Sequence, residues 1–236
     1  MPHNSQCEFE AVLSLADNAY YPWGLLRLLE GLFLEALRSR LIGLLAEPTP
    51  GLEEIDTFFS DLSPEACAEL TKTITGRHQR KLWEAAAGRP VRLDDIVPSD
   101  ISSAYEVIHL GRNSLPVFHQ FQKRFCRIEG SEDILYGYNE GKLRPLIGPG
   151  YFVARHDEET NSFCVDYHDI PPDDAHLPKG WPTLKTNDQG LGKLVFGGMI
   201  DYLRKVSPRV LIGRASRGGK LQNAYFILCR SDSNEH

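Results

Sequence analysis

Apolar residues repeat with two different periods along the chain, and the change of period divides the sequence in two. Over Trp23–Leu45, leucine and other apolar side chains recur every three or four positions, which predicts an amphipathic helix. Shorter helices are predicted over Gly51–Leu62, Pro64–Thr75 and Arg77–Ala87, with Ser63 as the N-cap of the second. The first 100 residues are therefore predicted to form a helical layer.

Beyond this layer the period becomes two. The stretch Arg89–Ser103, which holds Pro90, Pro98 and several aspartates, is predicted as a linker between the layers. Asp201–Val206 is predicted as a short helix that ends before Pro208. The predicted strands are Lys123–Ile128, Ile134–Tyr138, Tyr151–Arg155, Phe163–His168, Val210–Arg214 and Asn223–Arg230.

Two pairs of these strands are separated by short turn-forming stretches, which predicts hairpins. Tyr151–His156 and Ser162–His168 flank a polar segment, and Val210–Ala215 and Leu221–Cys229 flank a segment with a glycine pair. Many short antiparallel strands favour a small barrel or a strongly curved sheet, and a sheet covered on one face by the helices is the competing arrangement. We expect an α+β protein, with a helical region over residues 1–100 and an antiparallel, barrel-like domain over residues 101–236.

Composition narrows the classes of function. The 236 residues are 42% hydrophobic and 25% charged with a formal net charge of -6, so a general nucleic-acid-binding surface is disfavoured. Five cysteines without a C-x-x-C pair predict reduced thiols rather than a zinc or disulfide framework. Five charged residues interrupt Trp23–Leu45, so this helix is not predicted to span a membrane. No signal peptide is recognised, and we expect a cytoplasmic protein without a cofactor.

The segment 194–230 resembles the closing part of the GXWXG-type bacterial proteins, although the Gly-x-Trp-x-Gly motif itself is absent. Those proteins end with an apolar strand, an aspartate and an arginine on a short turn, a strand bearing a glycine, and an aromatic-rich last strand. The resemblance implies a small lipocalin-like barrel. The matching positions are Asp201, Arg204, Val206, Gly213, Tyr225, Phe226, Leu228 and Arg230.

Two polar clusters could carry acid–base chemistry. In the first, Asp166 and His168 lie two positions apart on a predicted strand, so the carboxylate could orient the imidazole and raise its basicity. The alternatives are a solvated loop, which is typical of this composition, or a divalent metal held within residues 166–176. Because the spacing fits no known ligand pattern, no metal site is predicted.

The second cluster surrounds Arg112, which could hold a carboxylate bidentately while His109 or His119 acts as a base. The favoured alternative is structural: Arg112 and Asn113 would fix the connection between the helices and the β half. The glycines at 148 and 150 enter a predicted strand rather than a helix, which excludes a phosphate-binding P-loop.

Aromatic residues are concentrated in the β half, and in a barrel alternate strand residues point inward. Our leading hypothesis is a binding protein for a small hydrophobic or aromatic ligand inside the barrel, the alternative being an interior filled by side chains alone. Arg112 or Arg204 would contact an acidic group of the ligand. The predicted pocket residues are Tyr138, Tyr151, Tyr167, Trp181 and Tyr225.

Two other classes of function stay open. The protein could be an isomerase, cyclase or hydrolase in which His168 is the base, Asp166 orients it, and His109 or Tyr151 is the acid. It could instead be an interaction protein that associates, as a homodimer for example, through the Trp23–Leu45 helix. The inward or outward direction of Asp166 and His168 distinguishes the enzyme from the binding protein.

Overall fold

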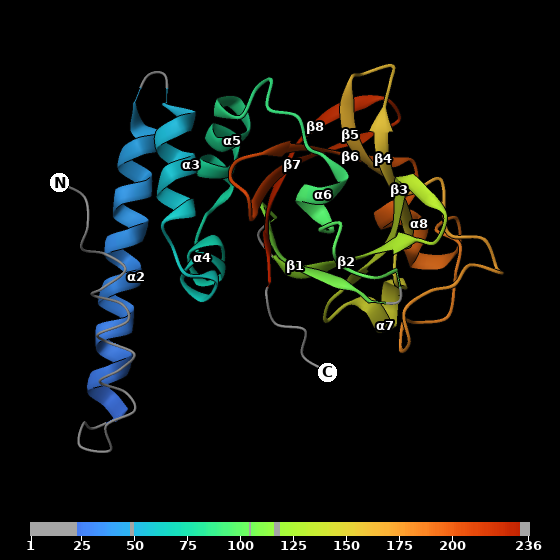
Figure 1. The fold of residues 1–236 in the computed structure, drawn as a ribbon, viewed down its shortest axis with the longest axis horizontal. Coiled ribbons are helices and arrows are strands. Elements are labelled where there is room, and N and C mark those ends of the chain that lie inside the picture. The colour runs from blue at the N-terminus through green and yellow to red at the C-terminus, as the bar shows by residue number, and fades with distance from the viewer. Residues whose placement is uncertain (1–22, 48–49, 104, 116–118, 232–236) are drawn as a thin grey trace.

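The computed structural model describes residues 23–47, 50–103, 105–115 and 119–231, and its main body is a closed barrel of eight antiparallel strands (Figure 1). Each strand pairs with the next along the chain, and β8 closes the barrel against β1. This arrangement confirms the predicted α+β class, with a helical region followed by an antiparallel barrel. The strands are β1 (Val107–Asn113), β2 (Gln120–Ile128), β3 (Ser131–Glu140), β4 (Phe152–Asp157), β5 (Ser162–Asp166), β6 (Met199–Lys205), β7 (Val210–Arg217) and β8 (Lys220–Arg230).

Four helices form a layer against one side of the barrel (Figure 1). The Ser63 hydroxyl accepts the Ala66 amide at 3.2 Å, so the predicted N-cap is confirmed. Apolar side chains of the helices share one core with the outer face of the last two strands, as Leu41 and Phe58 do with Ile212 and Ile227. The helices are α2 (Trp23–Ala46), α3 (Leu52–Ser60), α4 (Pro64–Thr71) and α5 (Gly76–Ala85).

The segment predicted as a helix over Asp201–Val206 is instead the second part of strand β6, which ends at Lys205, one residue before Val206. Asp201 and Leu203 are buried in the barrel, while Tyr202 and Arg204 point outward, so the side chains alternate with the period of a strand. Strand β1, which starts at Val107, is not among the predicted strands, and α4 ends at Thr71, four residues earlier than predicted.

The proline-rich stretch predicted as a linker closes one end of the barrel. Its short helix α6 (Leu93–Ile96) lies at the barrel mouth in Figure 1 and buries Ile96. Lys205 pairs with Asp95 at 2.5 Å, and Arg127 pairs with Asp94. Inward-facing cations at the strand ends are therefore matched by carboxylates of the segment that covers them.

The opposite end of the barrel is covered by α7 (Arg144–Ile147) and α8 (Gly190–Phe196), which contact each other. The ring of Phe196 stacks on Tyr167 with ring centroids 5.3 Å apart. It also lies so close to Gly150 that a β-carbon there would be 2.4 Å from the ring. Gly150 therefore admits the Phe196 ring that covers this end of the barrel.

Helix α2 packs on the other helices with only part of its surface. Leu37 and Leu41 are buried, whereas Leu28 and Leu32, one turn apart, are 59% and 60% exposed. None of the described helices has the length and apolar character needed to cross a membrane. Association of the chain through this helix stays a prediction.

Candidate functional site

The aromatic side chains inside the barrel are mainly phenylalanine rather than tyrosine, and they pack among aliphatic side chains. The rings of Phe152 and Phe226 lie against Gly137 and Gly213, where a β-carbon would be 2.3 Å and 2.1 Å from the ring atoms. Of the five predicted pocket aromatics only Tyr167 points inward, where it packs with Phe152 and Phe196. The expectation that several tyrosines line one interior is therefore wrong. Strand alternation places Tyr138 and Tyr225 on the outer face of the wall, and Tyr151 and Trp181 pack against Tyr138 on that side.

Three of these aromatics form a cluster on the outer face of β3 and β4. Tyr138 contacts both Tyr151 and Trp181, with ring centroids 5.6 Å and 5.0 Å away. The Tyr151 hydroxyl donates to the Pro182 carbonyl at 2.5 Å, and the Trp181 indole donates to Glu106 at 2.8 Å. Burial raises the pKa of Tyr138 to about 12 and that of Tyr151 further still, so both phenols stay protonated. The cluster fastens the long loop before α8 to the barrel wall.

Inside the barrel, one lysine is completely buried. The Lys123 ammonium contacts Asn139 at 3.1 Å, the Tyr167 hydroxyl at 2.5 Å and the Asp201 carboxylate at 3.1 Å. It also lies 5.0 Å from the centroids of the Phe152 and Tyr167 rings. Burial lowers the pKa of Lys123, and the Asp201 carboxylate opposes that shift. Its three donors meet three acceptors, so this is a satisfied ion pair of the core.

His109 also points into the barrel, near the end closed by α6. Its Nε2 atom lies 2.9 Å from the Ile96 carbonyl and so carries the proton, while Nδ1 has no hydrogen-bond partner in the described part of the chain. Burial lowers the pKa of His109 to about 4, which keeps the ring neutral at pH 7. The barrel wall separates it from Tyr151, Asp166 and His168.

Asp166 and His168 do form the predicted pair, but on the outer face of the barrel. The His168 Nδ1 atom lies 2.8 Å from Asp166, and the same carboxylate accepts from Arg155 at 2.8 Å. The His168 side chain is 53% exposed. Because these two residues face away from His109 and the barrel interior, the structure does not assemble the four predicted catalytic residues into one site.

Arg112 lies on the outer face of β1 and joins the barrel to the helices. Its Nη1 atom donates to the Lys72 carbonyl at 2.5 Å, and the Gln79 amide donates to the Arg112 carbonyl at 3.0 Å. Asn113 accepts the Leu115 amide at 2.9 Å and so shapes the following turn. These contacts agree with the structural alternative for Arg112 rather than with a ligand-binding role.

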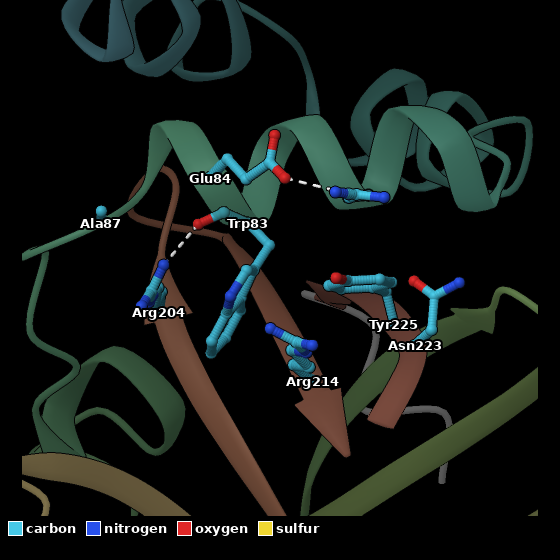
Figure 2. Close-up of a pocket in the computed structure, with 8 residues that line it drawn as sticks. Trp83, Glu84, Ala87, Arg204, Arg214, Asn223 and Tyr225 are labelled. Atoms are coloured by element: carbon cyan, nitrogen blue, oxygen red, sulfur yellow. Dashed lines mark hydrogen bonds and ion pairs between the residues drawn. The ribbon is translucent and has the colours of Figure 1, made fainter. Parts of the chain in front are cut away.

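The two remaining predicted residues, Arg204 and Tyr225, come together in a cavity of about 430 Å³ between α5 and strands β6–β8. Figure 2 shows Trp83 reaching from α5 toward the strands, from which Arg204 and Arg214 project. The volume lies within the range that small-molecule sites occupy. The lining residues are Arg80, Trp83, Glu84, Ala87, Arg204, Arg214, Asn223 and Tyr225.

Each strand arginine in this pocket is held by a ring and a carbonyl. The Arg204 guanidinium carbon lies 3.9 Å from the Trp83 ring centroid, and its Nη1 atom donates to the Trp83 carbonyl at 2.6 Å. Arg214 lies 5.2 Å from the Tyr225 ring centroid, and its Nε atom donates to the Gln222 carbonyl at 2.7 Å. The side chains are thus oriented, with further donors on each guanidinium available.

Positive charge in the pocket exceeds negative charge. No carboxylate of the described residues forms an ion pair with Arg204 or Arg214, and the one acidic lining residue, Glu84, pairs with Arg80 at 3.0 Å. Burial and the neighbouring Arg214 charge both lower the pKa of Arg204. An anion placed between these two arginines would relieve their repulsion and fill their remaining donors.

Arg204 and Tyr225 are among the binding residues predicted from the sequence, whereas Trp83 and Arg214 are not. A usable signal existed, because Tyr202, Arg204, Ile212 and Arg214 share the outer face that packs toward the helices. Two cations on a face that is otherwise apolar, without nearby acidic residues, indicate a site rather than a solvated surface. This signal depends on β6 being a strand, because only then do Arg204 and Arg214 share one face of the sheet.

Comparison of the chain with protein-family models, curated proteins and solved structures finds no match. The likeness of residues 194–230 to GXWXG-type proteins therefore stays a prediction. Among the residues with described positions, no three His, Cys, Asp or Glu side chains are grouped so that they could hold a metal ion.

Proposed function

We propose that this protein binds a small aromatic or otherwise planar molecule bearing an anionic group in the pocket between α5 and strands β6–β8. The observation that carries the proposal is the pair of oriented arginines, Arg204 and Arg214, without carboxylate partners beside Trp83 and Tyr225. The sequence-based hypothesis of an aromatic ligand with an acidic group is retained, and its location moves from the barrel interior to the barrel wall.

The chemistry of recognition follows from the two kinds of lining group. The arginine donors would bind a carboxylate, sulfonate or phosphate, and each charge-assisted hydrogen bond contributes about 1.5–3 kcal/mol. The faces of Trp83 and Tyr225 would supply apolar contact for a ring. Because the pocket is open to solvent, we expect the affinity to fall as ionic strength rises.

A matched pair of fluorescent probes tests this proposal. Anilinonaphthalene sulfonate carries an aromatic system and an anion, and N-phenylnaphthylamine carries a similar aromatic system without charge. We expect the anionic probe to bind at least about tenfold more tightly, because one good charged contact is worth about 1.4 kcal/mol or more. Equal affinity for both probes would contradict the proposed role of the arginines.

Substitutions of pocket residues test whether the two probes bind in this pocket. The double variant Arg204→Gln/Arg214→Gln should lose the preference for the anion, and Trp83→Leu should weaken both probes. Arg77→Gln is the matched control, because Arg77 is an exposed arginine of α5 outside the pocket lining. If the pocket variants bind both probes as the wild type does, the probes occupy another part of the molecule and the proposal fails.

A further inference from the structure

Two cysteines from opposite layers of the molecule meet in its core. Cys67 on α4 and Cys229 on β8 lie 162 positions apart in the sequence, yet their sulfur atoms are 3.3 Å apart and share a hydrogen bond. Both side chains are completely buried among apolar residues of the core that joins the helices to the barrel. Both are free thiols.

We propose that Cys67 and Cys229 are a redox modification site, at which a peroxide oxidises the two thiols to a disulfide between the helical layer and the barrel. In the first step a thiol attacks hydrogen peroxide, which gives a sulfenic acid and one water. In the second, the neighbouring thiol attacks the sulfenic sulfur, the S–S bond forms and a second water leaves. Two thiols lose two hydrogens in total, and the peroxide is reduced to two waters.

The geometry favours the second step. A disulfide has an S–S distance of about 2.05 Å, so the sulfurs must approach by a little more than 1 Å from their 3.3 Å separation. The neighbouring Cys229 sulfur and burial both raise the pKa of the Cys67 thiol, so little thiolate is present. The first step is therefore slow, while capture of the sulfenic acid by a thiol already in contact with it is fast.

The other two cysteines described by the structure are internal controls. Cys126 and Cys164 are buried as well, but neither contacts a thiol of the described residues. Burial raises the pKa of Cys126 to about 12 and that of Cys164 to about 11. Similar protection from solvent without a partner means that slow oxidation of these two residues cannot end in a disulfide with another cysteine of the described residues.

The bond would tie together two parts of the chain whose boundary includes the proposed ligand pocket. Strand β8 carries both Cys229 and the pocket residue Tyr225, and the partner helix α4 precedes the pocket helix α5. Closing so long a loop restricts the unfolded chain, so we expect the oxidised protein to melt about 10 °C higher than the reduced protein. Disulfide formation itself does not depend on whether the pocket binds a ligand.

The test uses the full chain carrying Cys7→Ser, which removes the cysteine outside the described residues. The protein is incubated with hydrogen peroxide, unfolded, alkylated with N-ethylmaleimide and analysed by intact mass and peptide mapping. We expect a product that takes up two fewer alkyl groups, a peptide linking Cys67 to Cys229, and a higher melting temperature that a reductant reverses.

Two matched variants show whether the cross-link and the rise in melting temperature depend on the proposed cysteine pair. Cys229→Ser should abolish both the cross-link and the rise in melting temperature, whereas Cys126→Ser should leave both unchanged. The proposal is overturned if Cys67 and Cys229 remain as open to alkylation as Cys126 and Cys164. It is also overturned if the peptides that contain Cys67 or Cys229 gain oxygen without losing hydrogen, because that product is a sulfinic or sulfonic acid rather than a disulfide.

Discussion

The barrel interior and the pocket beside α5 both hold positively charged side chains, but among the described residues only the buried lysine of the interior pairs with a carboxylate, whereas the two strand arginines of the pocket do not. Inside, Lys123 contacts a carboxylate, an amide oxygen and a hydroxyl. In the pocket, Arg204 and Arg214 are held by aromatic rings and backbone carbonyls, and their charges have no carboxylate counterpart among the described residues. An unpaired charge that is buried costs free energy because it loses its hydration, whereas water can still hydrate a charge at an open cavity. The comparison therefore separates charge that holds the fold from charge available to a ligand.

The largest expected effect comes from breaking the matched interior pair. Asp201→Asn should lower the free energy of unfolding by about 3–5 kcal/mol, because it leaves the Lys123 ammonium buried without a counter-charge. Urea denaturation measures the loss. Replacing both partners with apolar residues, as in Lys123→Met/Asp201→Leu, should recover most of it. A loss below about 1 kcal/mol in the single variant would show that the interior does not depend on this match.

Lowering the pH should reduce the free energy of unfolding by a smaller amount, through the buried His109 of the barrel interior. The pKa of His109 falls from 6.5 to about 4 on folding, so the unfolded chain binds more protons between these values. The free energy of unfolding should therefore fall as pH drops from 6.5 to 4, by up to about 3 kcal/mol from this group. Below pH 4 the contribution of the neutral His109 ring to the free energy of unfolding is lost, and above pH 6.5 it is present in full.

His109→Gln removes this titration, so its unfolding free energy should depend less on pH across the same range than that of the wild type. His168→Gln is the matched control, because it changes an exposed histidine on the outer face and keeps the buried imidazole. Parallel pH profiles for the wild type and His109→Gln would mean that the buried ring is charged, or that it is not buried in solution.

Substitutions in the pocket should do the reverse of those in the barrel interior. They should weaken binding of the probe and leave the free energy of unfolding nearly unchanged. Arg214→Gln should weaken binding of anilinonaphthalene sulfonate about tenfold, the equivalent of 1.4 kcal/mol, because one charged donor is lost. Its free energy of unfolding should stay within about 0.5 kcal/mol of the wild type, since no ion pair is broken. Fluorescence titration and urea denaturation of the same sample measure both. If Arg214→Gln loses stability but keeps its affinity for the probe, Arg214 stabilises the fold and is not a ligand-binding residue.

Sequence patterns predicted the scaffold better than the chemistry placed on it. The period-two alternation was sufficient for most of the barrel strands, because one face of each strand must be apolar. It did not place Asp201 correctly, because an inward aspartate is tolerated only through its contact with Lys123 on β2, far away in the sequence. Such a partner is set by barrel closure, which brings strands together without a local signal.

The pocket illustrates the same limit. The residue types of Arg204 and Tyr225 predict a contact with a ligand, which stays a prediction, and the structure places both residues in a pocket outside the barrel rather than in its interior. Trp83 lies in a helix more than a hundred positions earlier, and only the packing of α5 on β7 and β8 brings it to Arg204. His168 and Asp166 show the converse, since a local spacing correctly predicted their hydrogen bond but not which side of the wall they occupy.

The smallest expected effect comes from the one acidic residue at the pocket. Glu84 pairs with Arg80 one helical turn away, and both side chains are largely exposed. Glu84→Gln removes a negative charge from the lining and frees Arg80, so anilinonaphthalene sulfonate should bind about two- to threefold more tightly at low salt. The uncharged N-phenylnaphthylamine should bind unchanged. High salt should erase the gain, because the interaction of exposed charges is screened. If the variant instead binds both probes more tightly, the gain comes from apolar contact, and the positive charge of the pocket is not what selects the ligand.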